Sequence, residues 1–156
     1  MKMKLLHALT LGLLPITALA AKKAPPSTDK FDRLHAQQLA SGALKLDDAS
    51  FVDVVRVPRN YSAAILLTAR EQRFGCTLCK EFQPEWDLLA KSWVNGDKAG
   101  ESRVVFGTLD FSDGKAAFQQ LQLQTVPILV IYGPTVGKHA KPAGEPERWS
   151  FSDGYV

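Results

Sequence analysis

This sequence of 156 residues contains little of what many functional sites require. It has two cysteines and three histidines, and His7 lies in the apolar N-terminal segment. A structural zinc site takes about four ligands, and neither His35 nor His139 has a ligand-like partner, which disfavours a metal site. After residue 20 no run approaches the ~18 apolar residues of a membrane span. The lysines and arginines are scattered, which disfavours a nucleic-acid or polybasic membrane surface.

The first twenty residues have the pattern of a secretory signal peptide. Lys2 and Lys4 form a basic end, Leu5–Ala18 is apolar but short for a membrane span, and Ala18-Leu19-Ala20 offers small residues for cleavage. Without them the formal charge falls from +3 to +1, with 17 basic against 16 acidic residues. Such a chain would enter an oxidising compartment. The expected division is a signal peptide over 1–20, a linker over 21–28 and one domain over 29–156.

The two cysteines lie three residues apart in the stretch Phe74-Gly75-Cys76-Thr77-Leu78-Cys79-Lys80. The apolar run Ala63–Ala69 precedes them, and an amphipathic helical pattern from Cys76 to Trp93 follows. Residues three apart share a helix face, so the two sulfurs can close a small ring. A helix N-terminus also favours the thiolate. We therefore predict that Cys76 is the exposed nucleophile and Cys79 the buried resolving thiol, with no other cofactor.

Two prolines support this interpretation. Pro84 lies inside the helical pattern, where it removes a backbone hydrogen bond and bends the helix. Val126-Pro127 precedes the apolar run Ile128–Tyr132, and proline is tolerated at the start of a strand. With the cysteine pair these features resemble thioredoxin-like domains, in which the proline equivalent to Pro127 is cis and packs beside the redox pair. An inert structural disulfide and two unpaired core thiols remain alternatives.

The hydrophobic periodicity predicts an α/β domain of the thioredoxin-like type, with a mixed sheet and helices on both faces. Helices are expected over about Lys30–Ser41 (capped by Asp29 or Thr28), from Cys76 onward, and over Gly114–Leu121 (capped by Asp113). Strands are expected at Phe51–Val57, Ala63–Ala69, Val104–Leu109, Pro127–Tyr132 and, as an edge, Glu147–Phe151. The helical stripe expected in the core consists of Phe82, Trp86, Leu89 and Trp93.

Several short motifs, in this order, resemble one family. They are Pro58-Arg59-Asn60-Tyr61-Ser62, the cysteine pair, Ala90-Lys91-Ser92-Trp93, Val105–Phe111 and Val126-Pro127. The family is that of the thioredoxin-like oxidoreductase subunits of oligosaccharyltransferase, the N-glycosylation complex of the endoplasmic reticulum. The resemblance extends from Phe31 to Phe151 and implies a luminal redox domain followed by transmembrane helices. This sequence ends before the last helix expected for such a domain, so membrane anchoring would depend on a region outside it.

The resemblance implies an accessory subunit that captures nascent cysteine-containing polypeptides through a mixed disulfide at Cys76 and promotes glycosylation of nearby asparagines. Peptide would lie across Thr77, Leu78 and the Val126-Pro127 turn, with Phe74 adding apolar contact. The implied partners are the other subunits of the complex and those polypeptides. The alternatives are a free-standing secretory thiol-disulfide oxidoreductase and a peptide-binding module with a structural disulfide.

Two further expectations concern modification and release. Asn60-Tyr61-Ser62 is an N-glycosylation sequon, which makes Asn60 a candidate modification site. The apolar strand Ala63–Ala69 carries no carboxylate that would act as a base for the resolving thiol. Because attack requires a thiolate, we expect Cys79 to react slowly and a mixed disulfide at Cys76 to persist.

Overall fold

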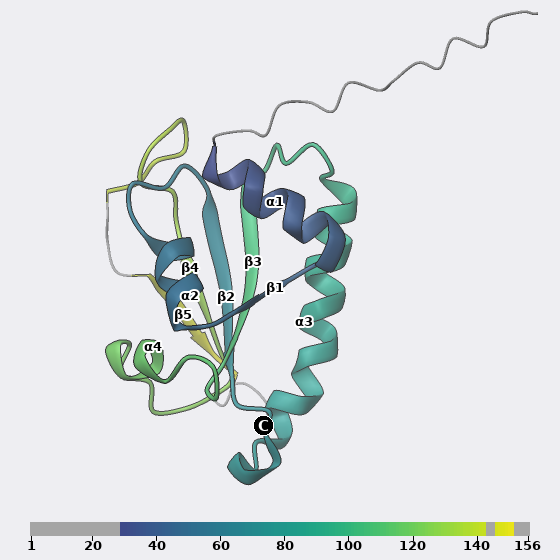
Figure 1. Ribbon diagram of the computed structural model, residues 1–156, viewed down its shortest axis with the longest axis vertical. Helices are drawn as coiled ribbons and strands as arrows, with labels where there is room; N and C mark the ends of the chain where they lie inside the picture. Colours follow the sequence, from purple (N-terminus) through teal and green to yellow (C-terminus); the bar gives the residue numbers. More distant parts are fainter. Residues whose placement is uncertain (1–28, 143–145, 152–156) are drawn as a thin grey trace, which may run out of the picture.

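The computed structural model describes residues 29–142 and 146–151, so the expected signal peptide and linker lie outside the described residues. Five strands form one sheet in the order β1-β3-β2-β4-β5, with β4 antiparallel to β2 and β5 and the other pairs parallel (Figure 1). The predicted mixed sheet is therefore confirmed. In chain order the elements are α1 (Lys30–Ser41), β1 (Leu44–Leu46), α2 (Asp48–Val55), β2 (Ser62–Thr68), the 3₁₀ turn η1 (Gln72–Phe74), α3 (Thr77–Gly96), β3 (Val104–Asp110), α4 (Lys115–Gln120), β4 (Ile128–Tyr132) and β5 (Glu147–Ser150).

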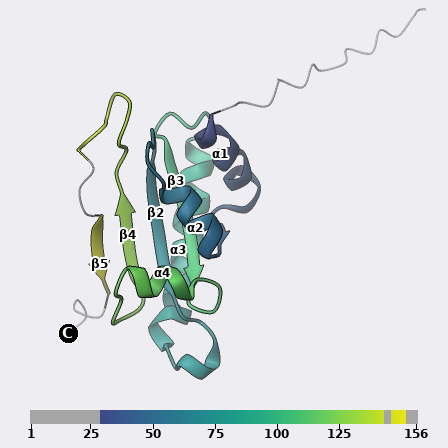
Figure 2. The same ribbon diagram turned by 60° about the vertical axis from the view of Figure 1, so that its left-hand side comes forward.

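Helices cover both faces of the sheet, as predicted (Figure 2). The central strand β2 is buried on both sides because its residues alternate between two cores. Ile65 and Leu67, both 0% exposed, pack in the core shared with α1, α2 and α4. Leu66, also 0% exposed, packs in the second core against Trp86 and Ala90 of α3. Among the described residues no helix has the length and apolar character needed to cross a membrane.

Helix α1 begins where predicted, with the carboxylate of Asp29 accepting the Phe31 N–H at 2.9 Å. Its most informative side chain is Gln38, which is polar and yet 1% exposed. The Gln38 amide donates to the Val104 carbonyl at 3.2 Å and accepts the Phe106 N–H at 2.6 Å. Strand β1 pairs only with the second half of β3, so Gln38 satisfies the backbone of the first half.

The predicted strand over Phe51–Val57 is wrong, because most of these residues form α2. Asp47 and Ser50 build a capping box, in which each side chain accepts the other residue's backbone N–H at 2.8 Å. Phe51 and Val54 are 3% and 2% exposed, and their spacing of three places both on the buried helix face. The valines suggested a strand, but the cap and the burial favour the helix. The three-residue strand β1 was not predicted.

The predicted cap of α4 by Asp113 is also wrong. The N-cap position is Gly114, which has no side chain to accept a hydrogen bond. Asp48 of α2 takes this role instead, accepting the Ala116 N–H at 3.2 Å and the Ala117 N–H at 2.8 Å. The beginning of α4 is therefore held by a residue distant in sequence, which local patterns do not reveal.

This arrangement predicts unequal effects of two aspartate substitutions. Asp48→Ala should lower the free energy of unfolding by about 1 kcal/mol, the usual cost of a lost helix cap. Asp113→Ala should cost less than about 0.5 kcal/mol, because its ion pair with Lys45 is exposed and 3.5 Å long. Urea unfolding followed by circular dichroism measures both. Equal losses would contradict the role assigned to Asp48.

The apolar stripe expected on α3 was placed correctly only in part. Trp86 is 1% exposed, but Leu89 and Trp93 are 49% and 45% exposed. A different line of residues on this helix faces the sheet, and Leu89 and Trp93 lie beside that line. The buried line consists of Cys79, Gln83, Trp86, Ala90 and Val94.

Candidate active site

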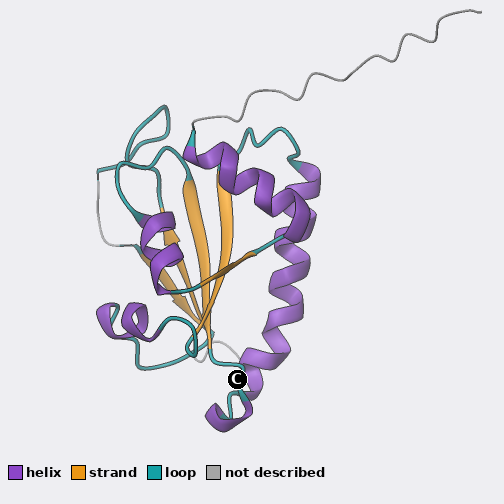
Figure 3. Cartoon of the chain, in the orientation of Figure 1, coloured by secondary structure: helices purple, strands orange, loops and turns teal. Residues whose placement is uncertain are grey.

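The cysteine pair lies at the N-terminal end of α3, which the chain reaches from the end of β2 through the η1 turn (Figure 3). Cys76 and Cys79 form a disulfide with their Cα atoms 5.3 Å apart. Cys79 is fully buried and Cys76 is partly exposed. The alternative of two unpaired thiols is therefore wrong. Within residues 29–142 and 146–151 no group of three His, Cys, Asp or Glu side chains could hold a metal ion.

The local backbone explains how Cys76 reaches the beginning of the helix. Gly75 ends the η1 turn with a φ of 64°, a left-handed conformation that glycine adopts without steric cost. This turn places Cys76 at the N-cap of α3, where the Cys79 N–H points at the Cys76 sulfur over 3.1 Å. After reduction the same N–H and the other unpaired N–H groups of the first turn would stabilise a Cys76 thiolate.

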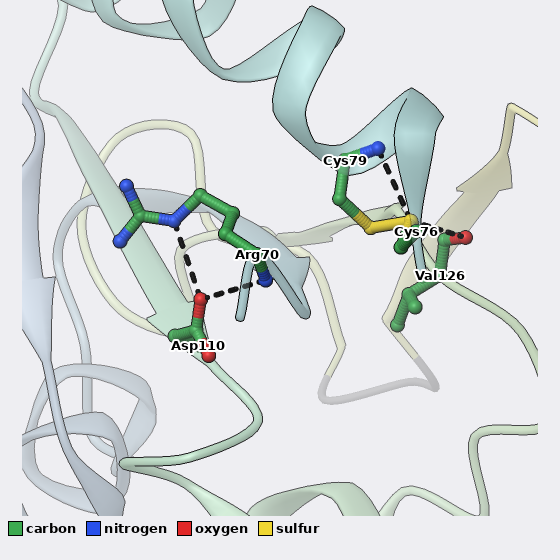
Figure 4. The surroundings of a disulfide bond; sticks show 5 residues. All are labelled: Arg70, Cys76, Cys79, Asp110 and Val126. Carbon is green, nitrogen blue, oxygen red and sulfur yellow. Dashed lines mark hydrogen bonds and ion pairs between the residues drawn. A yellow bond between two sulfur atoms is a disulfide. The ribbon is translucent and has the colours of Figure 1, made fainter. Parts of the chain in front are cut away.

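The peptide bond between Val126 and Pro127 is cis, as predicted. Strand β4 begins directly after it, and Ile128 pairs with Leu67 near the end of β2. This register brings Val126, which precedes the cis bond, beside the N-terminal end of α3 (Figure 4). The Val126 carbonyl oxygen lies 3.8 Å from the Cys76 sulfur. A disulfide sulfur has no proton to donate, so this oxygen is an acceptor only for the reduced thiol.

The other predicted peptide-contacting residues surround the pair without forming a deep pocket. Thr77 is exposed and Leu78 is half-buried, both in the first turn of α3. Phe74 is half-buried because its ring packs edge-on against Phe111, with ring centroids 5.2 Å apart. Part of the apolar surface expected to contact peptide is thus used within the domain.

A buried carboxylate, Asp110, lies in the surroundings of the disulfide and was not predicted from the sequence (Figure 4). Asp110, 5% exposed, ends β3 opposite Thr68 in the register. It accepts hydrogen bonds from the backbone N–H (3.1 Å) and the side chain (3.2 Å) of Arg70 and from the N–H (3.2 Å) and hydroxyl (2.9 Å) of Ser112. Desolvation raises the pKa of Asp110, but these hydrogen bonds lower it below the usual value. Asp110 is thus an ionised and fully bonded acceptor, which makes it a weak base. Its position directly after the expected strand Val104–Leu109 was the available signal.

The sequon lies at the opposite end of β2 from the cysteines. The side-chain amide of Asn60 is half-buried and donates to the Asp29 carboxylate at 3.1 Å. The next residue, Tyr61, is 2% exposed and donates its hydroxyl proton to the Val54 carbonyl at 2.7 Å. The sequon is therefore part of the packed structure, and a glycan on the Asn60 nitrogen would have to fit beside the Asp29 carboxylate.

A family model described as "OST3 / OST6 family, transporter family" matches residues 30–156. The chain is 27% identical over 127 residues to the mouse dolichyl-diphosphooligosaccharide–protein glycosyltransferase subunit MAGT1, covering 81% of this chain and 38% of that protein. It is 31% identical over 101 residues to subunit 3 of the same transferase from Saccharomyces cerevisiae, covering 58% of this chain and 29% of that protein. The chain thus spans less than two fifths of the length of these relatives.

Among solved structures, the long form of spinach chloroplast thioredoxin f is similar to this chain, with a TM-score of 0.53 and 15% identity. The similarity covers 76% of this chain and 81% of the thioredoxin. At this identity the likeness establishes the fold alone, which is thioredoxin-like. The cysteine pair at the beginning of a proline-containing helix and the cis Pro127 agree with that fold.

Proposed function

This chain belongs to the OST3/OST6 family, and on that premise we propose that it serves as an accessory subunit of oligosaccharyltransferase that tethers nascent polypeptides by thiol-disulfide exchange. The observation that carries this proposal is a partly exposed Cys76 at a helix N-terminus, bonded to a fully buried Cys79. The proposed compartment is the lumen of the endoplasmic reticulum. The proposed partners are the other subunits of the complex and cysteine-containing polypeptides.

The exchange begins when a client thiolate attacks the Cys76 sulfur. A bond forms between the client and Cys76, the bond between Cys76 and Cys79 breaks, and Cys79 leaves as a thiolate that takes up a proton. Release is the reverse step, in which the Cys79 thiolate attacks Cys76 and the client leaves as a thiolate. No net oxidation occurs, so the cycle requires no external electron acceptor. Tethering raises the effective concentration of nearby acceptor asparagines at the transferase.

Slow release of the client from Cys76 would support a tethering role. The residues around the cysteine pair favour slow release. Strand β2, which precedes the cysteine pair in the chain, ends in Thr68, a fully buried residue without a carboxylate. The nearby Asp110 is already bonded to Arg70 and Ser112. With no free base at hand, Cys79 should seldom be a thiolate, and the mixed disulfide should persist.

The non-covalent part of the proposal concerns the surface beside Cys76. An extended client segment would run over Thr77 and Leu78 and pair with the backbone of Val126, as in strand addition. Pro127 is buried and has no N–H, so it offers the client no backbone donor and the pairing depends on Val126.

The experiment is to replace both cysteines by serine in the full-length protein and to measure sequon occupancy in secreted glycoproteins by mass spectrometry. Occupancy should fall at sequons close to cysteines and stay unchanged at sequons without one, which serve as the internal control. The variant should still co-purify with the other subunits. A uniform fall, or none, would favour a free-standing oxidoreductase or a module whose disulfide is structural.

We also propose that modification of Asn60, where it occurs, precedes folding of this domain. The support is the hydrogen bond from the Asn60 amide to Asp29 and the burial of Tyr61 in the middle of the sequon. Glycosylation after folding would have to break both arrangements.

A further inference from the structure

A cavity of about 1010 Å³ lies at the end of the sheet opposite the disulfide. Its walls are the loop before β2, the beginning of β2, the end of β4 and the loop over residues 133–142, which stands above the strands in Figure 1. The volume is at the upper end of the range for binding pockets. The five residues of β4 separate it from Pro127 by roughly 16 Å. An occupant of this cavity would therefore leave Cys76 accessible.

The base of the cavity holds a buried cation, Arg59, which is 5% exposed. Its two terminal nitrogens donate to the carbonyls of Val55 and Gly133, and its guanidinium carbon lies 5.6 Å from the centre of the Tyr132 ring. The Nε–H is buried and has no hydrogen-bond partner among the described residues. A buried donor without a partner is rare, because it loses its water without compensation.

Arg59 also lacks a counter-ion in the described part of the chain. Its neighbour Arg103 is paired with Asp29 at 2.7 Å, but none of the ion pairs among residues 29–142 and 146–151 includes Arg59. Buried arginines are usually paired. Burial accordingly lowers the pKa of Arg59, and the hydroxyl groups of Tyr61 and Tyr132 only partly offset this effect. The wall of the cavity thus holds a positive charge that has no counter-ion among the described residues.

The walls indicate which anion would fit. Lys138 and Lys141 add positive charge, but Glu101 and Glu147 also line the cavity. These carboxylates would repel a phosphate dianion more than a singly charged carboxylate. Apolar side chains, among them Val136, supply surface for an aliphatic stem. The planar guanidinium matches the geometry of a carboxylate.

We propose that this cavity binds the side-chain carboxylate of an aspartate or glutamate in an acidic segment of a partner polypeptide, with Arg59 as its counter-ion. The site is independent of the cysteine pair and does not rest on the proposed redox function. It gives the domain a second attachment point at the end remote from Cys76.

The test is a titration of the ¹⁵N-labelled chain, observed by NMR, with a capped pentapeptide that has one glutamate between valines. The Arg59 Nε–H signal and the amide signals of residues 132–138 should shift saturably. The same peptide with glutamine should bind about tenfold or more weakly, since one hydrogen bond to a charged group is lost. Inorganic phosphate should bind more weakly than the glutamate peptide. An unmoved Arg59 signal, equal binding of both peptides, or tighter binding of phosphate would each overturn the proposal.

Two valines provide a matched pair of variants that spare Arg59 itself. Val136 lines the cavity and Val52 lies on α2 outside its lining, and both are 43% exposed. Val136→Glu should abolish peptide binding, because the new carboxylate competes for Arg59 and repels the peptide. Val52→Glu should bind the peptide as the wild type does. Equal binding by both variants, with unchanged circular dichroism, would contradict the location of the site.

Discussion

A reduced Cys79→Ser chain, mixed with a disulfide-linked dimer of a cysteine peptide, is expected to accumulate a mixed disulfide through Cys76. The Cys76 thiolate attacks the peptide disulfide, one peptide is bound and the other leaves as a thiolate. Serine at position 79 cannot displace the bound peptide, so the adduct persists until an external thiol is added. Intact-protein mass spectrometry would register a mass increase of one peptide.

The reverse substitution is the control. Cys76→Ser should give no adduct, because the remaining thiol of Cys79 is fully buried beneath the helix N-terminus. The wild-type chain should form the adduct and release it more slowly than a thioredoxin does, since Asp110 is occupied by other hydrogen bonds. Adducts of similar yield in both serine variants would show that the roles of the two cysteines are wrongly assigned. Release as fast as from thioredoxin would remove the argument for a persistent tether.

Trp86→Ala is expected to cause the largest loss of stability. The indole is 1% exposed, packs against Phe106 with ring centroids 5.6 Å apart and donates to the Thr108 hydroxyl at 3.0 Å. Removing a buried tryptophan costs about 3–5 kcal/mol, partly because a cavity remains. A domain of this size is stable by only about 5–15 kcal/mol, so a marginal variant would be partly unfolded. Urea unfolding of the oxidised chain, followed by circular dichroism, measures the loss.

Trp93, on the same helix, provides a matched comparison. It is 45% exposed and donates to the hydroxyl of Ser102 at 3.0 Å. Trp93→Ala should therefore cost only about 1 kcal/mol, as is common for partly exposed positions. If the two variants lose the same stability, the sheet-facing line assigned to α3 is incorrect.

Much of the candidate site was accessible from the sequence, because its parts are contiguous or strongly patterned. Two cysteines at a spacing of three, placed between an apolar strand and a helix, predicted the disulfide and the burial of Cys79. The cis bond before Pro127 followed from the resemblance and is confirmed. Asp110 was missed because a single acidic residue after a strand does not indicate which neighbours will pack on it.

The errors in the fold have the same origin. The valines after Phe51 suggested a strand, whereas the capping box at Asp47 and Ser50 and the burial of Phe51 and Val54 favour a helix. Asp113 occupies a plausible capping position, but Asp48 reaches α4 from another helix. In both cases a local preference was weaker than a contact formed in the folded chain.

The sequence by itself determined the features that depend on near neighbours along the chain: the amphipathic helix with its cysteine pair, the apolar central strand and the proline before β4. Only the tertiary structure decided where Gln38, Arg59 and Asp110 would lie. Gln38 and Asp110 can be buried because backbone or charged groups from distant segments form hydrogen bonds with them. Arg59 is hydrogen-bonded to the distant Gly133 carbonyl, but its hydrogen-bonding groups are satisfied only in part. Sequence spacing encodes which residues share a face, but the register between strands sets which distant groups come within hydrogen-bonding distance.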